Sequence, residues 1–121
     1  CNFPDAGLVH LKGLTKLEGL GLDYSEVTDA GLEHLKGLTN LRTLSLEDTS
    51  ITGAGLVHLK GLTKLKTLHL SHTKVTDAGL VHLEGLTELE RLFLYNTGGG
   101  KVTDAGVKKL QQALPRCKIE H

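Results

Sequence analysis

Hydrophobic residues recur with a fixed spacing of 24 positions along most of the chain. The segments VTDAGLEHLKGLT, ITGAGLVHLKGLT and VTDAGLVHLEGLT begin at Val27, Ile51 and Val75. A period of this length is typical of repeat architectures, in which one small unit of secondary structure stacks on the next. The pattern therefore predicts an array of similar units, each packed against its neighbours.

Each unit contains two different hydrophobic periods. In residues 41–46, LRTLSL, leucines alternate with polar residues toward the end, which predicts a strand with one buried face. Leu56, Leu59 and Leu62 then follow with the spacing of a short helix. Because helices are wider than strands, we expect the stacked units to bend with a parallel sheet on the inner, concave side.

The predicted helices have recognisable end signals. A threonine precedes each helix, where its side-chain oxygen is expected to cap a free amide. Asp29 and Asp77 place negative charge in the first turn, where the helix dipole favours it. A glycine follows the last helical residue, where a left-handed backbone is expected. The threonines are Thr28, Thr52 and Thr76, and the glycines are Gly37, Gly61 and Gly85.

The pattern LxxLxLxxT followed by VTDAGLxHLKGLT resembles the leucine-rich repeat family over roughly residues 3–119. Within that family it is most similar to bacterial proteins with the TDAGL form, which are related to the cysteine-containing repeats of F-box-type receptors. The resemblance implies an α/β leucine-rich repeat solenoid with its sheet on the concave side and short helices on the convex side. It also implies binding of a protein on the concave face and no enzymatic activity.

One position departs from the family pattern. The place usually held by Asn or Cys is occupied by hydroxyl residues, which are expected to satisfy backbone groups in the turn. These residues are Ser25, Thr49, Thr73 and Thr97.

The 121 residues fit one domain. Residues 1–16 correspond to a truncated first repeat, 17–97 to four strand units, and 98–100 to a glycine insertion. Residues 101–121 are expected to form a C-terminal cap, with a polar helix over about 104–113 and a closing strand at 117–119. The chain is expected to be a segment of a larger protein.

The N-terminal end is expected to lack a polar cover. Terminal repeats normally carry a polar cap, but the first unit places leucines and one phenylalanine at this end. The first strand would also have an unpaired edge, which is a template for another chain. We therefore expect either that the chain is a piece of a longer array or that it self-associates through this end. The residues concerned are Phe3, Leu8, Leu11, Leu14, Leu17, Leu20 and Leu22.

Charge and hydropathy exclude several partners. Fourteen basic and fourteen acidic residues cancel, which gives no electrostatic support for binding nucleic acid or an anionic membrane. No apolar run approaches the roughly 20 residues of a membrane span.

Cys1 and Cys117 should lie on the order of 20 Å apart across the strand layers, and so an intramolecular disulfide is not expected. Cys117 is expected to be buried.

Variable residues at the outward strand positions indicate a protein-binding surface. These positions are small or acidic in the first units and aromatic in the last, and Arg91, Phe93 and Tyr95 are residue types that anchor interfaces. Acidic residues are expected to add electrostatic selectivity. The candidate partner-binding residues are Asp23, Tyr24, Glu47, Asp48, His69, His72, Arg91, Phe93 and Tyr95.

Histidines raise an alternative. His69 and His72, near Glu47 and Asp48, offer ligands for a weakly held transition metal, or a small-ligand or hydrolase site. A second set, His10, His34, His58 and His82, follows the 24-residue period, and its members are too far apart for more than two of them to meet at one ion. No cofactor is predicted, because no pattern for one is present.

Overall fold

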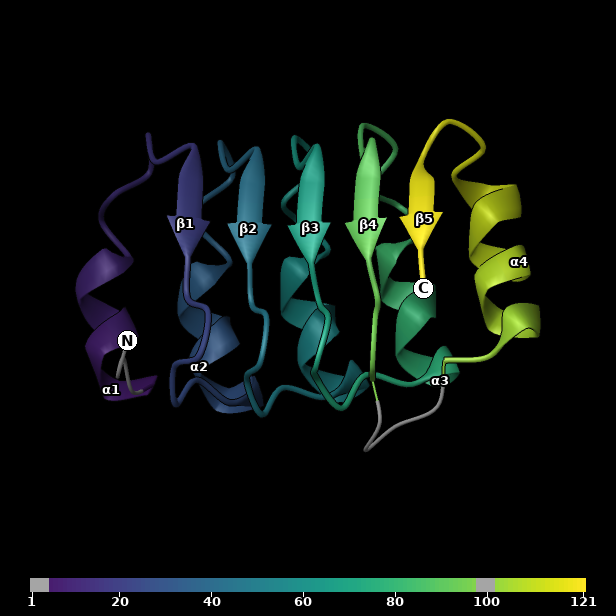
Figure 1. Cartoon of the computed structure of the whole chain (residues 1–121). Helices are drawn as coiled ribbons and strands as arrows, with labels where there is room; N and C mark the ends of the chain where they lie inside the picture. Colours follow the sequence, from purple (N-terminus) through teal and green to yellow (C-terminus); the bar gives the residue numbers. More distant parts are fainter. Residues whose placement is uncertain (1–4, 98–101) are drawn as a thin grey trace.

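The computed structural model describes residues 5–97 and 102–121. These residues form one parallel sheet in the order β1-β2-β3-β4-β5, with helical segments on one side of it (Figure 1). The architecture is an α/β repeat solenoid, as the sequence predicts. The strands are β1 (Gly19–Gly21), β2 (Thr43–Ser45), β3 (Thr67–His69), β4 (Arg91–Phe93) and β5 (Lys118–Glu120).

The strands are aligned by the repeat itself. Leu20, Leu44, Leu68 and Leu92 are successive Cα partners across the sheet, and Ile119 continues the row. The closing strand lies one residue later than the predicted 117–119. That difference matters below, because it brings Glu120 into the sheet.

The helical side of each unit is shorter and tighter than a regular α-helix. The sequence DAGL forms one α-turn, and the next three residues continue as a 3-10 turn. The fourth helix is a full α-helix, as predicted. The segments are α1 (Asp5–Leu8), η1 (Val9–Leu11), α2 (Asp29–Leu32), η2 (Glu33–Leu35), η3 (Gly53–Leu59), α3 (Asp77–Leu80), η4 (Val81–Leu83) and α4 (Asp104–Ala113). None of the helices in these described ranges is both long and apolar enough to cross a membrane.

The core is a stack of leucine layers between sheet and helical turns. Leu35, Leu38, Leu41 and Leu44 of the second unit are completely buried, and their counterparts in the third unit are buried as well. Burial of one such side chain contributes roughly 1.5–3 kcal/mol. Cys117 occupies a buried place in the same cluster, as predicted.

The first unit is less well covered than the others. Leu14 is 49% exposed, although its counterpart Leu38 is fully buried. Leu11, Leu17 and Leu20 are only partly buried. The prediction of an uncovered layer is wrong for Leu8 and Leu22, which the structure buries. Phe3 lies outside the described residues, as do Cys1 and the Gly98–Gly100 insertion.

The predicted left-handed glycines are not observed. None of the glycines in the described chain has a positive φ. The left-handed residues follow the strands instead, with φ of 59° at Tyr24, 55° at Asp48, 58° at His72 and 49° at Asn96. At these residues the chain turns away from the sheet, and the first three still donate their N–H to a carbonyl of the next unit. Asp, Asn and His tolerate this region better than most residues, which explains three of the four.

The hydroxyl residues at the family's Asn or Cys position do satisfy turn backbone. Ser25 Oγ donates to the Leu22 carbonyl at 2.6 Å, and Thr49 and Thr73 make the same bond within their own units. All three side chains are buried. A buried hydroxyl without a partner would cost free energy, and this bond removes that cost.

Two carboxylates connect neighbouring units at the helix starts. Asp29 accepts the backbone N–H of Thr52 at 2.7 Å and its hydroxyl at 2.5 Å. Asp77 makes the same pair of bonds to Thr103. Thr52 and Thr103 also cap their own helices as predicted, whereas Thr28 and Thr76 make no capping bond through the side chain.

Gly53 stands where Asp29 and Asp77 stand in their units, and so the junction with Thr76 has no such carboxylate. The backbones approach closely there instead. A Cβ added to Gly53 would lie 2.7 Å from the Cα of Gly79. Thr52 and Lys74 also form an isolated parallel bridge, with Lys74 N–H donating to the Ile51 carbonyl at 3.0 Å.

Candidate protein-binding face

The outward positions of the five strands form a continuous surface, called here the sheet face. It consists of small residues over β1 and β2 and of larger ones over β3 to β5. The positions are Gly19, Gly21, Thr43, Ser45, Thr67, His69, Arg91, Phe93, Lys118 and Glu120.

The C-terminal half of the sheet face carries an ordered group of large side chains. The rings of His69 and Phe93 are stacked, with centroids 4.3 Å apart and an interplanar angle of 10°. The guanidinium carbon of Arg91 lies 5.3 Å from the Phe93 ring centroid, within the range of a cation–π contact. The two residues that the sequence pairs as aromatic anchors, Phe93 and Tyr95, thus belong to a group that also includes His69 and Arg91.

Glu120 completes this group, and sequence reasoning missed it. The Tyr95 hydroxyl donates to Glu120 Oε1 at 2.9 Å, and Arg91 Nη2 lies 3.5 Å from Glu120 Oε2. This hydrogen bond is the main cause of a raised pKa for Tyr95, followed by desolvation and the nearby negative charge. Alternation of polar and apolar residues in Lys118-Ile119-Glu120 was the sequence signal that could have identified Glu120. Because Ile119 packs against the core, Glu120 faces outward, and the strand pairing sets it beside Phe93. We call His69, Arg91, Phe93, Tyr95 and Glu120 the aromatic cluster.

The acidic residues at the other half are less available than predicted. Asp23 Oδ1 accepts the Ser45 hydroxyl and, at 3.3 Å, the backbone N–H of Glu47. Asp23 and Glu47 are half-buried, and Asp48 is exposed. Ser71 in the next unit is buried, and its hydroxyl oxygen accepts the Tyr95 N–H at 3.0 Å. Asp48 and Glu47 are therefore the carboxylates of this region that remain for a partner.

Tyr24, Asp48 and His72 lie beyond the strand ends, at the left-handed turn. Tyr24 is 61% exposed. Asp48 and His72 line an open hollow of about 350 Å³ that also includes Lys74 and Asn96. His72 thus belongs to this rim, whereas the His69 ring stacks on Phe93. Within the described ranges, no three His, Cys, Asp or Glu side chains are grouped to hold a metal ion.

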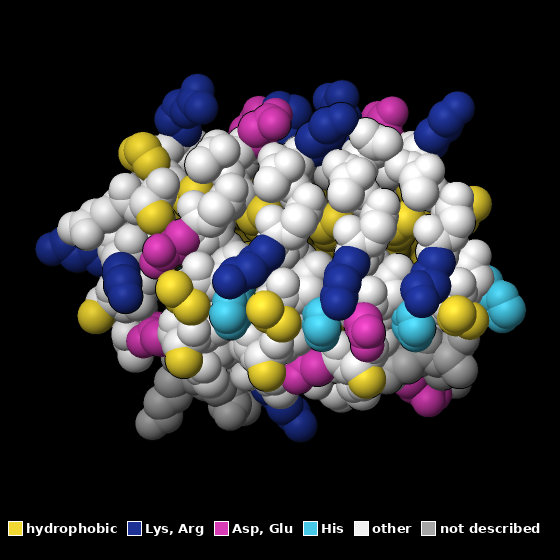
Figure 2. All heavy atoms as spheres, turned by 180° about the vertical axis from the view of Figure 1, so that it is seen from behind, with side chains coloured by type: hydrophobic (Ala, Val, Ile, Leu, Met, Phe, Trp, Pro, Cys, Tyr) yellow, Lys and Arg dark blue, Asp and Glu magenta, His cyan; other side chains and the backbone are white. Residues whose placement is uncertain are grey.

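Histidines also form a row on the opposite, helical side of the molecule (Figure 2). His34, His58 and His82 are half-buried there, in line with the 24-residue period. The Nδ1 atoms of His34 and His82 are buried without a hydrogen-bond partner. The row reflects the spacing of the units, and its members share no common centre among the described residues.

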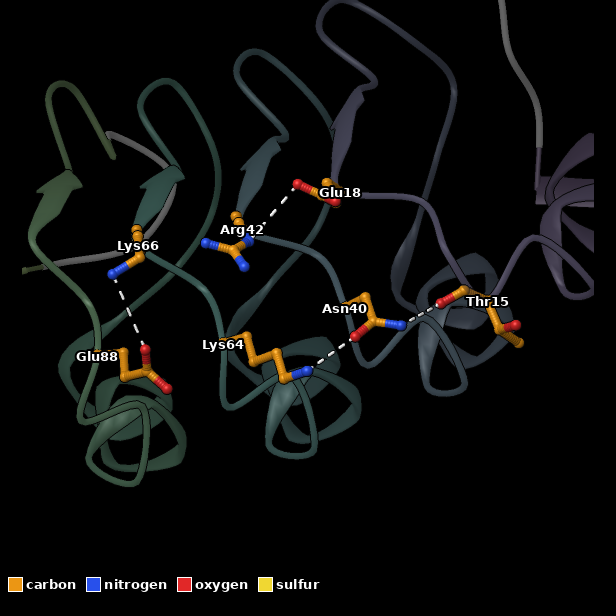
Figure 3. Close-up of polar contacts among 7 residues, drawn as sticks. All are labelled: Thr15, Glu18, Asn40, Arg42, Lys64, Lys66 and Glu88. Carbon is orange, nitrogen blue, oxygen red and sulfur yellow. Dashed lines mark hydrogen bonds and ion pairs between the residues drawn. The ribbon is translucent and has the colours of Figure 1, made fainter.

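Polar contacts between units line the rim where the strands begin (Figure 3). Asn40 donates to the Thr15 carbonyl at 2.7 Å and accepts from Lys64 Nζ at 2.9 Å. Arg42 Nε lies 3.6 Å from Glu18 Oε1 and forms an ion pair with it. Because these side chains are largely solvated, such pairs contribute about 0–1 kcal/mol each.

Comparison with known proteins places this architecture in a class. The family model described as leucine rich repeat matches residues 39–98. The structure is similar to internalin C2 of Listeria monocytogenes, with a TM-score of 0.66 and 28% identity over 90% of this chain and 44% of that one. It is also similar to an internalin, inlF, of the same organism, with a TM-score of 0.58 and 20% identity over 93% and 36% of the two chains. No curated protein sequence matches the chain.

These findings confirm the family expected from the sequence. The chain is a leucine-rich repeat protein. It spans less than half the length of either internalin. The similarity to the second internalin concerns the fold alone, and the narrower kinship with TDAGL-type and cysteine-containing repeats stays a prediction.

Proposed function

We propose that this protein is a non-enzymatic scaffold that binds another protein through the C-terminal half of its sheet face. The observation that carries the proposal is the aromatic cluster, in which five side chains from three strands and the turn after β4 hold one another in place. Tyrosine and arginine are among the residue types that dominate binding energies at interfaces.

Pre-organisation makes this cluster a better binding site than separate exposed residues. A partner that immobilises a free side chain loses roughly 0.5–1.5 kcal/mol of binding free energy per side chain. Tyr95 is 42% exposed, yet its hydroxyl is already fixed by Glu120. The Phe93 ring is likewise held by its neighbours. Binding therefore requires little further ordering of the surface.

The distribution of charge and size indicates what the partner presents. Small residues over β1 and β2 leave room beside the aromatic cluster, and Glu47 and Asp48 border that region. A partner with an apolar or aromatic side chain against Tyr95 and a basic side chain toward Glu47 and Asp48 fits both halves. Such charges mainly set specificity and the association rate.

Selection of binding peptides provides the test, because it needs no known partner. A displayed random peptide library is enriched on the immobilised protein, and the resulting peptides are measured against single variants. Tyr95→Ala and Phe93→Ala are each expected to weaken binding by more than about 1 kcal/mol, or roughly fivefold.

Val57→Ala is the matched control, because Val57 lies on the helical side and is 41% exposed, close to the 42% of Tyr95. It is expected to leave the affinity unchanged. Peptides that lose as much affinity on Val57→Ala or Lys60→Ala as on Tyr95→Ala would show that the sheet face is not the preferred binding surface.

A further inference from the structure

Two positive charges are neighbours on the C-terminal part of the sheet face. Arg91 is the first residue of β4, and its Cα partner at the start of β5 is Lys118. Both residues are exposed, and neighbouring strands lie about 4.8 Å apart. The same row over β1 to β3 holds only uncharged residues, which are Gly19, Thr43 and Thr67. Positive charge in this row is therefore confined to β4 and β5, beside the aromatic cluster.

The two positive charges are not equally compensated. Arg91 Nη2 lies 3.5 Å from Glu120 Oε2, and its guanidinium carbon lies 5.3 Å from the Phe93 ring centroid. Lys118, in contrast, makes no side-chain hydrogen bond or ion pair with any of the described residues. The carboxylate of Glu90, the residue before Arg91, is already paired with Lys66 Nζ at 3.3 Å. Two cations beside one carboxylate leave one positive charge on this surface without a partner.

The arrangement of Arg91 and Lys118 does not contribute to the stability of the sheet. Like charges on neighbouring strands repel each other, whereas an acidic residue at position 118 would have offered Arg91 an opposite charge. The core does not need the lysine either, because Ile119 is the residue of β5 that packs against it. The described contacts therefore give no structural reason for a lysine at this place, and an anion supplied from outside gives a functional one.

We propose that the binding partner places a carboxylate between Arg91 and Lys118, next to the apolar or aromatic side chain that contacts Tyr95. The inference rests on the proposed function and specifies the chemistry that the same site recognises. A single carboxylate matches the one uncompensated positive charge, whereas a doubly charged phosphate would bring excess negative charge close to Glu120. The guanidinium, held by Phe93 and Glu120, supplies donors in a fixed plane, and the lysine adds a more adaptable point charge.

The strand geometry sets the spacing within the partner. Phe93 lies two residues after Arg91 and Tyr95 four residues after it, which places them roughly 7 and 13 Å along the strand direction. An extended partner segment therefore has its acidic residue two to four positions from its aromatic or large apolar residue. Glu47 and Asp48 follow β2 on the side where the strands end, and they repel a carboxylate there. The sheet face thus accepts an acidic group toward the strand starts and a basic group toward the strand ends.

The test uses peptides enriched from a displayed random library on the intact chain and sorted by whether Tyr95→Ala weakens their binding. Peptides that depend on Tyr95 are expected to carry Asp or Glu two to four positions from an aromatic or large apolar residue. Lys118→Glu is expected to weaken these peptides about tenfold, because it sets like charges against each other. Replacement of the acidic residue of the peptide by lysine is expected to restore most of the affinity lost in this variant.

Lys109→Glu is the matched control, because Lys109 is an exposed lysine on α4 and its substitution changes the net charge by the same amount. It is expected to leave the affinity unchanged. Peptides that depend on Tyr95 but bind Lys118→Glu and Lys109→Glu equally well would overturn this inference and leave the proposed function intact. Peptides that are indifferent to Tyr95→Ala would instead contradict the proposed function itself.

Lys118→Gln removes the charge without reversing it. It is expected to weaken the acidic peptides about threefold, and the loss should nearly vanish at roughly 1 M salt, where the Debye length falls to about 3 Å. Self-association of Lys118→Gln with unchanged peptide affinity would show that the lysine protects a strand edge, contrary to the inference.

A phosphoserine variant of the peptide distinguishes the two kinds of anion. If phosphoserine in place of the acidic residue raises the affinity more than tenfold, the site prefers a doubly charged anion and the inference is wrong. Thermal melts of each protein variant separate loss of folding from loss of binding. Lys118→Glu is expected to melt no lower than the unaltered chain, because it gives Arg91 an opposite charge on the neighbouring strand.

Discussion

At the scale of single residues, the carboxylates at the helix starts do more than the sequence indicates. Asp29 and Asp77 lie in the first turn, where the dipole argument places them, but their oxygens bind the threonine of the following unit. Hydrogen bonds to a charged acceptor contribute more than neutral ones. The same side chain thus belongs to a helix end and to a junction between units.

One junction between units has the carboxylate–threonine bond, from Asp29 to Thr52, and the next one lacks it because Gly53 replaces the aspartate. Comparing the two junctions therefore measures the contribution of this bond to stability. Thr52→Val is expected to destabilise the protein by about 1–2 kcal/mol, because it removes the hydroxyl bonds to Asp29 and Ala54. Thr76→Val should cost much less, since Gly53 supplies no carboxylate at that junction and Thr76 makes no capping bond. Urea unfolding of the two variants provides the comparison. Equal losses would mean that the carboxylate contributes nothing beyond the threonine itself.

At the scale of secondary-structure elements, the tight helical turns depend on close backbone approach. The segment η3 is 3-10 throughout, and it is also the segment that begins with Gly53. A Cβ on Gly79 would lie 2.3 Å from the Cα of Gly53, so η3 and α3 touch through backbone atoms. The unit that lacks the carboxylate therefore packs more tightly against its successor.

This contact predicts opposite results for two glycine substitutions. Gly53→Ala should destabilise the protein by about 1–3 kcal/mol, because the methyl group forces backbone segments apart. Gly61→Ala should be neutral or stabilise by up to about 1 kcal/mol, since nothing lies within 4 Å of its Cβ and alanine restricts the unfolded chain. Thermal or urea melts check both. A harmless Gly53→Ala would show that η3 and α3 separate at little cost.

At the scale of the whole molecule, a solenoid is held together by contacts between neighbouring units, and its stability is a sum of local terms. The first unit has a neighbour on one side only among the described residues, and four of its leucines remain partly exposed. Stability is therefore expected to be lowest at this end and highest in the middle of the sheet.

Amide exchange of two equivalent residues tests that gradient. Leu22 and Leu70 each donate to a carbonyl of the next unit, at 2.9 and 2.8 Å, so the hydrogen bonds themselves are matched. At low concentration, the Leu22 amide is expected to exchange faster than the Leu70 amide because local opening at the end costs less. Equal exchange rates would show that the five strands open as one cooperative unit.

Periodicity in the sequence was enough to predict the strands, the short helices, the long α4 and the buried Cys117, because these follow from burial of regularly spaced apolar residues. It failed where conformation depends on contacts between units. The glycines after the helices are not left-handed, and Tyr24, Asp48, His72 and Asn96 are. Of the candidate site, Arg91, Phe93 and Tyr95 lie on the predicted surface, but Glu120 required the register of a strand that has no repeat to copy.

The junction geometry also bears on how such an array changes length during evolution. Each first helical position, Asp29, Gly53 or Asp77, faces a glycine of the following unit, at 55, 79 or 106, where a Cβ would clash with it. The Gly53 unit and the Asp77 unit thus each carry both halves of the joint, and duplication of either unit in the gene reproduces a fitting partner without changing its neighbours. Copies of the Asp77 unit would inherit the carboxylate bond, whereas each copy of the Gly53 unit would add a joint without it. Arrays grown from the first kind should tolerate more later mutations than arrays grown from the second.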